Sequence, residues 1–262
     1  MKKIILSIFS LLVFAGCKER IQDFGDLDFL TANDAIVKIN MASVYPDDRY
    51  MYVRFNDNRV TPLIRAREPY PGGGYNTRGD SRPDFLKIAA GTVNIKVCLP
   101  YKIDNGKDSI VLAQQNVTLE PGKQYTVHVT DTAANTKMFL AEESLVRPDS
   151  SFAKYRFVNL MPNVEAIDLY YGAAANSSGQ DSLIVRNIKY GETSEYFTIR
   201  RAASRTWKIR KSGDPVADNT VLALYTNASS TLNARSYTAY ALGYAGFTTT
   251  IMRPYISFYL VR

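Results

Sequence analysis

Short runs in which apolar and polar residues alternate recur along this 262-residue chain from residue 35 onward. Clear examples are residues 51–55, 93–97 and 125–129, and turn-forming clusters such as Glu120-Pro121-Gly122 separate them. Successive side chains of a strand point to opposite faces, so this period of two predicts strands that each bury one face. No helical period longer than about ten residues stands out. The sequence therefore predicts an all-β fold in which short strands form a sandwich or a barrel.

The strand pattern occurs twice. Five segments of the first half match five of the second half in the same order, at offsets from 110 residues (Val111 to Val221) to 118 residues (Ala35 to Ala153). The matched pairs are 35–39 with 153–157, 51–55 with 167–171, 95–97 with 207–209, 111–113 with 221–223 and 124–126 with 236–238. This order predicts two domains, residues 34–146 and 152–262, joined by a short polar linker. A repeat of this size fits an immunoglobulin-like sandwich of roughly 100 residues, so we expect two tandem immunoglobulin-like β-sandwiches.

The first sixteen residues are typical of a secretory signal peptide. Two lysines precede an apolar stretch at residues 4–15, which is shorter than the roughly 20 residues that a membrane-spanning helix needs. The following Phe14-Ala15-Gly16-Cys17 resembles the lipobox of bacterial lipoproteins, with Phe14 where Leu is commoner. This resemblance implies that Cys17 carries lipid. The residues that follow are rich in Asp and Glu and show no helical or strand period, so we expect residues 17–33 to form an acidic tether behind the lipid. We expect a membrane partner through the N-terminal lipid and a place in the cell envelope, at the outer membrane. An ordinary secretory signal is the alternative.

Four short motifs in the second half point to a family. They are Val158-Asn159 at a strand end, Ile167-Asp168-Leu169-Tyr170, Tyr190-Gly191, and a late Tyr237-Thr238 strand. Together they resemble the repeat called domain of unknown function 4397, which is frequent in bacterial cell-surface lipoproteins. Residues 34–146 match this pattern more weakly because they lack the Val-Asn and Tyr-Gly steps. The resemblance implies a β-sandwich and carries no catalytic residue to this chain.

Three aromatic residues are candidates for structural roles. Tyr125 and Tyr237 each open a strand after a turn-like segment, so each is either a tyrosine corner, whose hydroxyl bonds upstream backbone, or an ordinary strand residue. Trp207 is the single tryptophan, and we expect it to fill the core of the second domain rather than to line a binding face.

The residues needed for most catalytic centres are scarce. The only histidine is His128, and because it lies between Val127 and Val129 we expect its side chain on the solvent face of its strand. With two cysteines and no Gly-x-Ser-x-Gly motif, we expect no His-based triad, no metal and no cofactor. Paired carboxylates remain open, so a hydrolase is the weaker alternative to a protein that is not an enzyme. The formal charge of +7 is dispersed, whereas nucleic-acid binding needs a dense basic stripe, so we expect no nucleic-acid partner.

A long loop at residues 61–84 is the candidate interaction site. Loops longer than about 12–15 residues are uncommon and often functional, and Arg and Tyr are enriched at binding hot spots. The candidate ligand-contact residues are Arg65, Arg67, Tyr70, Tyr75 and Arg78. An insertion without a binding role is the alternative.

The function expected from these patterns is a lipid-anchored binding or structural surface module. Two narrower hypotheses stay open, each with its own partner. The first is a glycan-binding accessory of a nutrient-uptake system, favoured by the Tyr-rich composition. The second is a subunit of a surface assembly, which would contact another envelope protein by pairing along an edge strand at residues 255–260.

Overall fold

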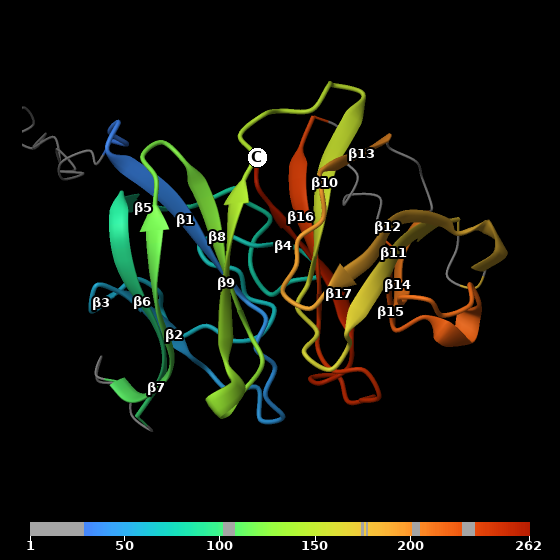
Figure 1. Ribbon diagram of the computed structural model, residues 1–262, viewed down its shortest axis with the longest axis horizontal. Helices are drawn as coiled ribbons and strands as arrows, with labels where there is room; N and C mark the ends of the chain where they lie inside the picture. The colour runs from blue at the N-terminus through green and yellow to red at the C-terminus, as the bar shows by residue number, and fades with distance from the viewer. Residues whose placement is uncertain (1–28, 102–107, 174–175, 177, 201–204, 227–233) are drawn as a thin grey trace, which may run out of the picture. The chain divides into compact units, whose positions relative to one another are not determined.

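The computed structural model describes residues 29–101, 108–173, 176, 178–200, 205–226 and 234–262 (Figure 1). Their regular structure consists of β-strands and three 3₁₀ turns, at Ala133–Asn135, Ser178–Gln180 and Asp218–Thr220. This confirms the all-β prediction. The predicted signal peptide and Cys17 lie outside the described residues. None of the described segments forms a helix long and apolar enough to cross a membrane.

Residues Ala32–Arg262 form one compact unit that contains four antiparallel or mixed sheets. Sheet 1 has the order β3-β2-β6-β7, with strands Asn58–Arg59, Tyr52–Phe55, Gly91–Pro100 and Asp108–Leu119. Sheet 2 has the order β5-β1-β8-β9, with strands Leu86–Ala89, Asp34–Met41, Gln124–Thr130 and Lys137–Glu143. The alternating apolar residues of these two sheets, such as Val37, Val53 and Val127, are fully buried between them and form the first sandwich.

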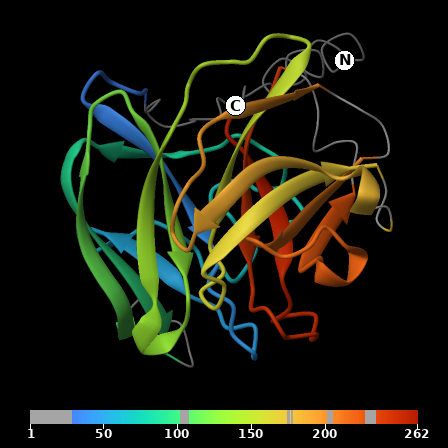
Figure 2. The same cartoon turned by 45° about the vertical axis from the view of Figure 1, so that its right-hand side comes forward.

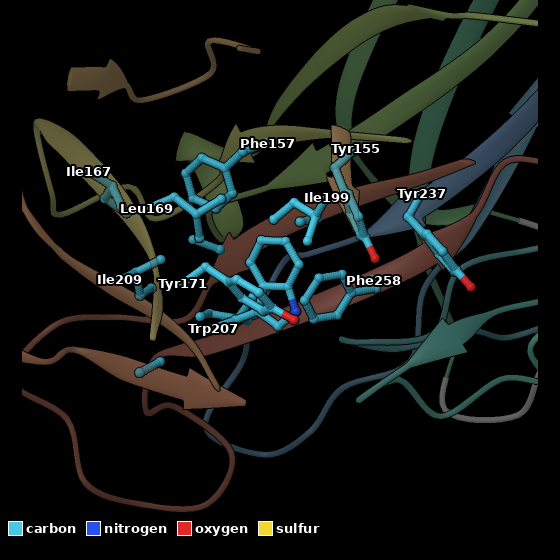
Figure 3. Close-up of a cluster of buried hydrophobic side chains, with 14 of the residues drawn as sticks. Tyr155, Phe157, Ile167, Leu169, Tyr171, Ile199, Trp207, Ile209, Tyr237 and Phe258 are labelled. Atoms are coloured by element: carbon cyan, nitrogen blue, oxygen red, sulfur yellow. The ribbon is translucent and has the colours of Figure 1, made fainter. Parts of the chain in front are cut away.

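The second sandwich is built in the same way. Sheet 3 has the order β13-β10-β16-β17-β4, with strands Phe197–Arg200, Phe152–Asn159, Ser236–Leu242, Tyr255–Leu260 and Gly74–Tyr75. Sheet 4 has the order β12-β11-β14-β15, with strands Ser182–Lys189, Ala166–Gly172, Thr206–Lys211 and Ala223–Thr226. The prediction of two β-sandwiches is thus confirmed. The core of the second is rich in aromatic rings, and Figure 3 shows Trp207 among Tyr155, Tyr171 and Phe258.

The matched sequence segments occupy equivalent positions in the two sandwiches. In the first, β1 runs parallel to β8 with Val37 opposite Tyr125. In the second, β10 runs parallel to β16 with Tyr155 opposite Tyr237. The antiparallel pairs are equivalent as well: Val53 lies opposite Val97 in the first sandwich, and Leu169 lies opposite Ile209 in the second. The same hydrophobic pattern therefore sets the same register twice, as expected where one face of each strand is buried.

Sheets 2 and 3 pack against each other through the faces that point away from their own cores (Figures 1 and 2). Part of this interface is apolar and includes Val158, Leu242 and Tyr259. The rest is polar, and it includes His128, which is 0% exposed. The expectation that His128 lies on a solvent face was therefore wrong, because the second sandwich covers that face of β8.

The loop at residues 61–84 supplies a strand to the second sandwich. Its β4 pairs with β17, placing Tyr75 opposite Phe258 and Gly74 opposite Tyr259. A side chain at Gly74 could not fit there, because a Cβ atom would lie 1.7 Å from the Phe258 carbonyl oxygen. Since β17 also pairs with β16 on its other side, residues 255–260 do not form the free edge strand expected from the sequence.

Candidate ligand-binding cleft

An open cleft of about 600 Å³ lies on the second sandwich beside β15. Three stretches and two single residues line it: residues 221–225, 247–248 and 253–255, Asp218, and Asn76 from the 61–84 loop. Three aromatic rings contribute, from Tyr225, Phe247 and Tyr255. Phe247 is 48% exposed although it is large and apolar, so its ring is available to a ligand.

The ring of Tyr255 is fixed by two guanidinium groups. The Arg67 guanidinium carbon lies 4.0 Å from the ring centroid, and that of Arg253 lies 4.8 Å from it. The Tyr255 hydroxyl donates a hydrogen bond to the Thr250 carbonyl. Cation–π contacts of this kind hold the ring in place. Arg253 itself is exposed and lines the cleft, so it adds a positive charge there.

Asn76 is held rigidly where the 61–84 loop meets the cleft. Arg67 Nη2 donates to the Asn76 carbonyl at 2.9 Å and to its side-chain oxygen at 2.8 Å. The Asn76 side-chain nitrogen donates to the Ile256 carbonyl at 2.7 Å, and Ser257 Oγ donates to the Asn76 carbonyl at 2.7 Å. An amide has two N–H donors and two acceptor lone pairs, so Asn76 keeps hydrogen-bonding capacity for a ligand.

Asp218 supplies a negative charge to the same cleft. Its Oδ1 accepts hydrogen bonds from the Ser178 backbone N–H at 3.2 Å and from the Ser178 hydroxyl. The hydroxyl bond is the main cause that lowers the pKa of Asp218, so this carboxylate stays ionised at neutral pH. The cleft thus combines ring faces with a guanidinium, an amide and a carboxylate. Such a mixture fits a ligand with apolar faces and polar edges.

The structure distributes the five predicted contact residues of the 61–84 loop among different roles. Arg65 and Arg78 each donate to Asp48 Oδ2 at 2.7 Å, which ties the loop down. Tyr70 packs against the first core and Tyr75 against the second, where its ring centroid is 5.8 Å from that of Tyr237. Arg67 contacts two cleft residues, Tyr255 and Asn76, and so helps to fix the cleft.

The cleft residues Tyr225, Phe247 and Arg253 were not singled out from the sequence. They come from a short edge strand and from the segment between β16 and β17. The sequence signal that could have pointed to the cleft was Phe247, because this aromatic residue is flanked by Gly246 and three threonines in a segment without a strand period.

The other aromatic residues named from the sequence are buried. The Tyr125 hydroxyl accepts a hydrogen bond from the backbone N–H of Glu120, five residues upstream, at 3.2 Å. Tyr237 stacks on Tyr155 with ring centroids 5.3 Å apart. Trp207 is 0% exposed and its ring centroid lies 4.7 Å from that of Tyr171.

A closed group of buried charges lies on sheet 4. Asp181 bridges Lys208 Nζ at 2.8 Å and Arg210 Nη2 at 2.7 Å, and all three side chains are 0% exposed. Removing one member of such a group would leave a buried charge without its counter-ion, which is costly, so these side chains have a structural role. Within the described ranges, no group of three or more His, Cys, Asp or Glu side chains is placed to hold a metal ion.

Comparison with solved structures finds distant similarity to β-rich bacterial proteins. One set is the family 41 carbohydrate-binding modules from streptococcal virulence factors, described for α-glucan recognition, with 8% identity over 85% of this chain and 96% of that chain and a TM-score of 0.24. A candidate cell-adhesion protein from Bacteroides uniformis has 7% identity over 88% of this chain and 100% of that chain, also at a TM-score of 0.24. A multi-modular glycogen-degrading pneumococcal virulence factor has 12% identity over 85% of this chain and 22% of that chain, with a TM-score of 0.24.

The curated protein sequences compared with this chain include no match. A family model does match, and it covers part of the chain. It extends from the 61–84 loop through the later strands of the first sandwich and into β10 and β11 of the second, so it includes the Val158-Asn159 and Ile167–Tyr170 motifs. The resemblance seen in the sequence is confirmed there: residues 77–170 match the domain of unknown function 4397.

Proposed function

We propose that this protein is a binding module that captures a carbohydrate chain in the cleft described above. The observation that carries the proposal is the exposed Phe247 ring beside Tyr225, with Arg253 and Asn76 at the same opening. A sugar ring has apolar C–H faces that pack on aromatic rings and hydroxyl edges that need hydrogen-bond partners. The pre-fixed Tyr255 and Asn76 reduce the ordering cost of binding.

We also propose that the cleft binds without catalysis. Glycoside hydrolysis uses two carboxyl groups about 5–9.5 Å apart, one of them a general acid with a raised pKa. Asp218 is the one carboxylate among the described residues that line the cleft, and its pKa is shifted downward. This direction favours a fixed negative charge over proton donation at neutral pH.

A glycan array probed with the full chain tests the proposal. We expect bound glycans, and we expect Phe247→Ala and Tyr225→Ala each to weaken binding to them by about tenfold or more, which corresponds to about 1.4 kcal/mol. Tyr50→Ala is the matched control, because Tyr50 is also an exposed aromatic residue, at 42%, stacked against Arg65 outside the cleft. An array without hits, or hits that Phe247→Ala and Tyr50→Ala affect equally, would overturn it.

The proposed cellular role is that of a lipid-anchored accessory that concentrates glycan at the cell envelope for uptake. The lipobox-like sequence ending at Cys17 supports the anchor. Each buried acyl CH₂ contributes about 0.8 kcal/mol, and stable anchoring needs more than one chain. Mass spectrometry of protein extracted from outer membranes should find acyl chains on Cys17 as the first residue, and Cys17→Ser should release the protein to the soluble fraction. An unmodified thiol at residue 17 would refute the anchor and leave the glycan proposal standing.

A further inference from the structure

Strand β7 (Asp108–Leu119) is a long edge strand whose regular part, residues 113–119, lacks the usual protection. It is the last strand of sheet 1, paired on one side with β6, and no backbone hydrogen bond from another described strand or loop reaches its other side. Residues 113–119 keep a regular register with β6, while Leu112 is skipped in the pairing at a bulge. The sequence from 109 to 119 contains no charged residue and no proline. An exposed strand of this kind is a template for pairing with another strand.

The other edge strands of the described sheets are protected against pairing with a further strand. Strand β12 is eight residues long, but it carries Arg186 and Lys189 and pairs irregularly with β11. Strand β9 carries Lys137 and two glutamates. The remaining end strands β3, β4, β5, β13 and β15 have two to four residues each. Short edges and charged edges both prevent strand addition, so β7 differs from every other described edge.

We propose that β7 is a homodimer interface, at which two copies of this chain pair their β7 strands antiparallel and join their first sheets. The charge pattern selects a second copy as the occupant. In an antiparallel two-fold pair, each residue of the strand faces a symmetry-related residue of the same segment, and the residue on the axis faces its own copy, so charges of one sign in this segment would be brought together. Residues 109–119 avoid this repulsion completely, and Gln114, Gln115 and Asn116 supply exposed amides that can bond across the pair.

The interface has a consequence for binding. The cleft belongs to the second sandwich, whereas β7 belongs to the first, so pairing through β7 uses no residue of the cleft. A dimer would present two clefts, and a chain with repeating units could engage both. Such linkage raises the effective affinity without any new contact at either cleft.

Analytical ultracentrifugation of the full chain over a range of concentrations tests the dimer. We expect a reversible monomer–dimer equilibrium for the wild type. Gln115→Lys places a charge in the regular part of β7, where two copies would face each other, and it should raise the dimer dissociation constant by about tenfold or more. Val216→Lys is the matched control, since Val216 is 46% exposed in the second sandwich and the added charge is the same.

Hydrogen exchange of the wild type provides a second measurement that needs no variant. Amides of residues 113–119 that point away from β6 should exchange more slowly at high protein concentration than at low concentration. A monomer at all concentrations would overturn the proposal. So would a dimer that Gln115→Lys and Val216→Lys leave equally intact, or one whose β7 amides show no concentration dependence.

Discussion

The Arg156 guanidinium on β10 lies 2.8 Å from the Glu143 carboxylate on β9, and this ion pair joins the two sandwiches. The two side chains are 6% and 0% exposed. Glu143 also accepts hydrogen bonds from the Thr126 hydroxyl at 2.8 Å and from the Tyr259 hydroxyl at 2.7 Å. A buried carboxylate is tolerable only when it is paired and hydrogen-bonded, and here both sandwiches supply the partners.

We predict that Glu143→Gln destabilises the protein by about 3–5 kcal/mol, because the substitution leaves the Arg156 cation buried without its counter-ion. Urea denaturation measures the change. The control is the neighbouring Glu142→Gln, which breaks a surface pair with Lys123 whose side chains are 43% and 50% exposed, and which should have a much smaller effect. Equal effects of the two substitutions would show that the buried pair does not hold the sandwiches together.

The second prediction concerns the single histidine. Burial, assisted by the nearby positive charge of Arg156, lowers the pKa of His128 to about 3. The Asn40 side-chain nitrogen donates to His128 Nδ1 at 3.0 Å, so the neutral ring is the hydrogen-bonded form. An unfolded histidine has a pKa near 6.5, so between pH 6.5 and 3 the unfolded chain binds more protons than the native protein. The stability that this residue contributes is therefore complete above about pH 6.5 and falls as the pH drops toward 3.

Because there is one histidine, its ring resonances in the NMR spectrum are unambiguous. We expect no titration of the native ring between pH 8 and 5. The free energy of unfolding should decrease by up to about 1.4 kcal/mol per pH unit below pH 6.5 from this group. In His128→Gln this part of the slope should vanish. A native titration midpoint near 6.5 would show that solvent reaches the ring.

The sequence predicted which residues form the two cores, but it predicted neither the interface between the sandwiches nor the cleft. Period two identified which residues of β1 and β8 face inward, and the duplicated register followed from it. The same period led to the wrong prediction for His128, because a polar strand face covered by polar partners has the same sequence pattern as a face in contact with solvent. The cleft was not predicted for another reason: Asn76, Tyr225 and Phe247 lie far apart in the sequence, and Asn76 reaches the cleft only because β4 pairs with β17.

We predict that the two sandwiches unfold together. Residues from both bury polar groups in their interface, including Thr130, whose hydroxyl donates to the Leu160 carbonyl at 2.8 Å. Separating the sandwiches would also expose the apolar part of the interface, including Val158, Leu242 and Tyr259, to water, and this cost favours one cooperative transition. Trp207 fluorescence reports on the core of the second sandwich, and the His128 resonances report on the face of the first sandwich that meets the second. Their urea midpoints should coincide in the wild type, and two separate midpoints would disprove the coupling.

The last prediction tests the strand that links the 61–84 loop to the second sandwich. Gly74→Ala would place a Cβ atom 1.7 Å from the Phe258 carbonyl oxygen, so β4 must move away from β17. We expect a loss of about 1–3 kcal/mol in the free energy of unfolding, the usual cost of overpacking. Asn76 follows β4 closely, so its displacement should also weaken ligand binding at the cleft.

Gly179→Ala is the control for Gly74→Ala, because a Cβ atom at Gly179 would meet nothing within 4 Å. It should leave stability unchanged or raise it slightly, since alanine restricts the unfolded chain more than glycine does. Urea denaturation of both variants, together with amide exchange at Tyr75, measures the difference. If Gly74→Ala were as stable as Gly179→Ala and kept its Tyr75 protection, β4 would not be fixed by its close approach to β17, and the placement of Asn76 at the cleft would need another cause.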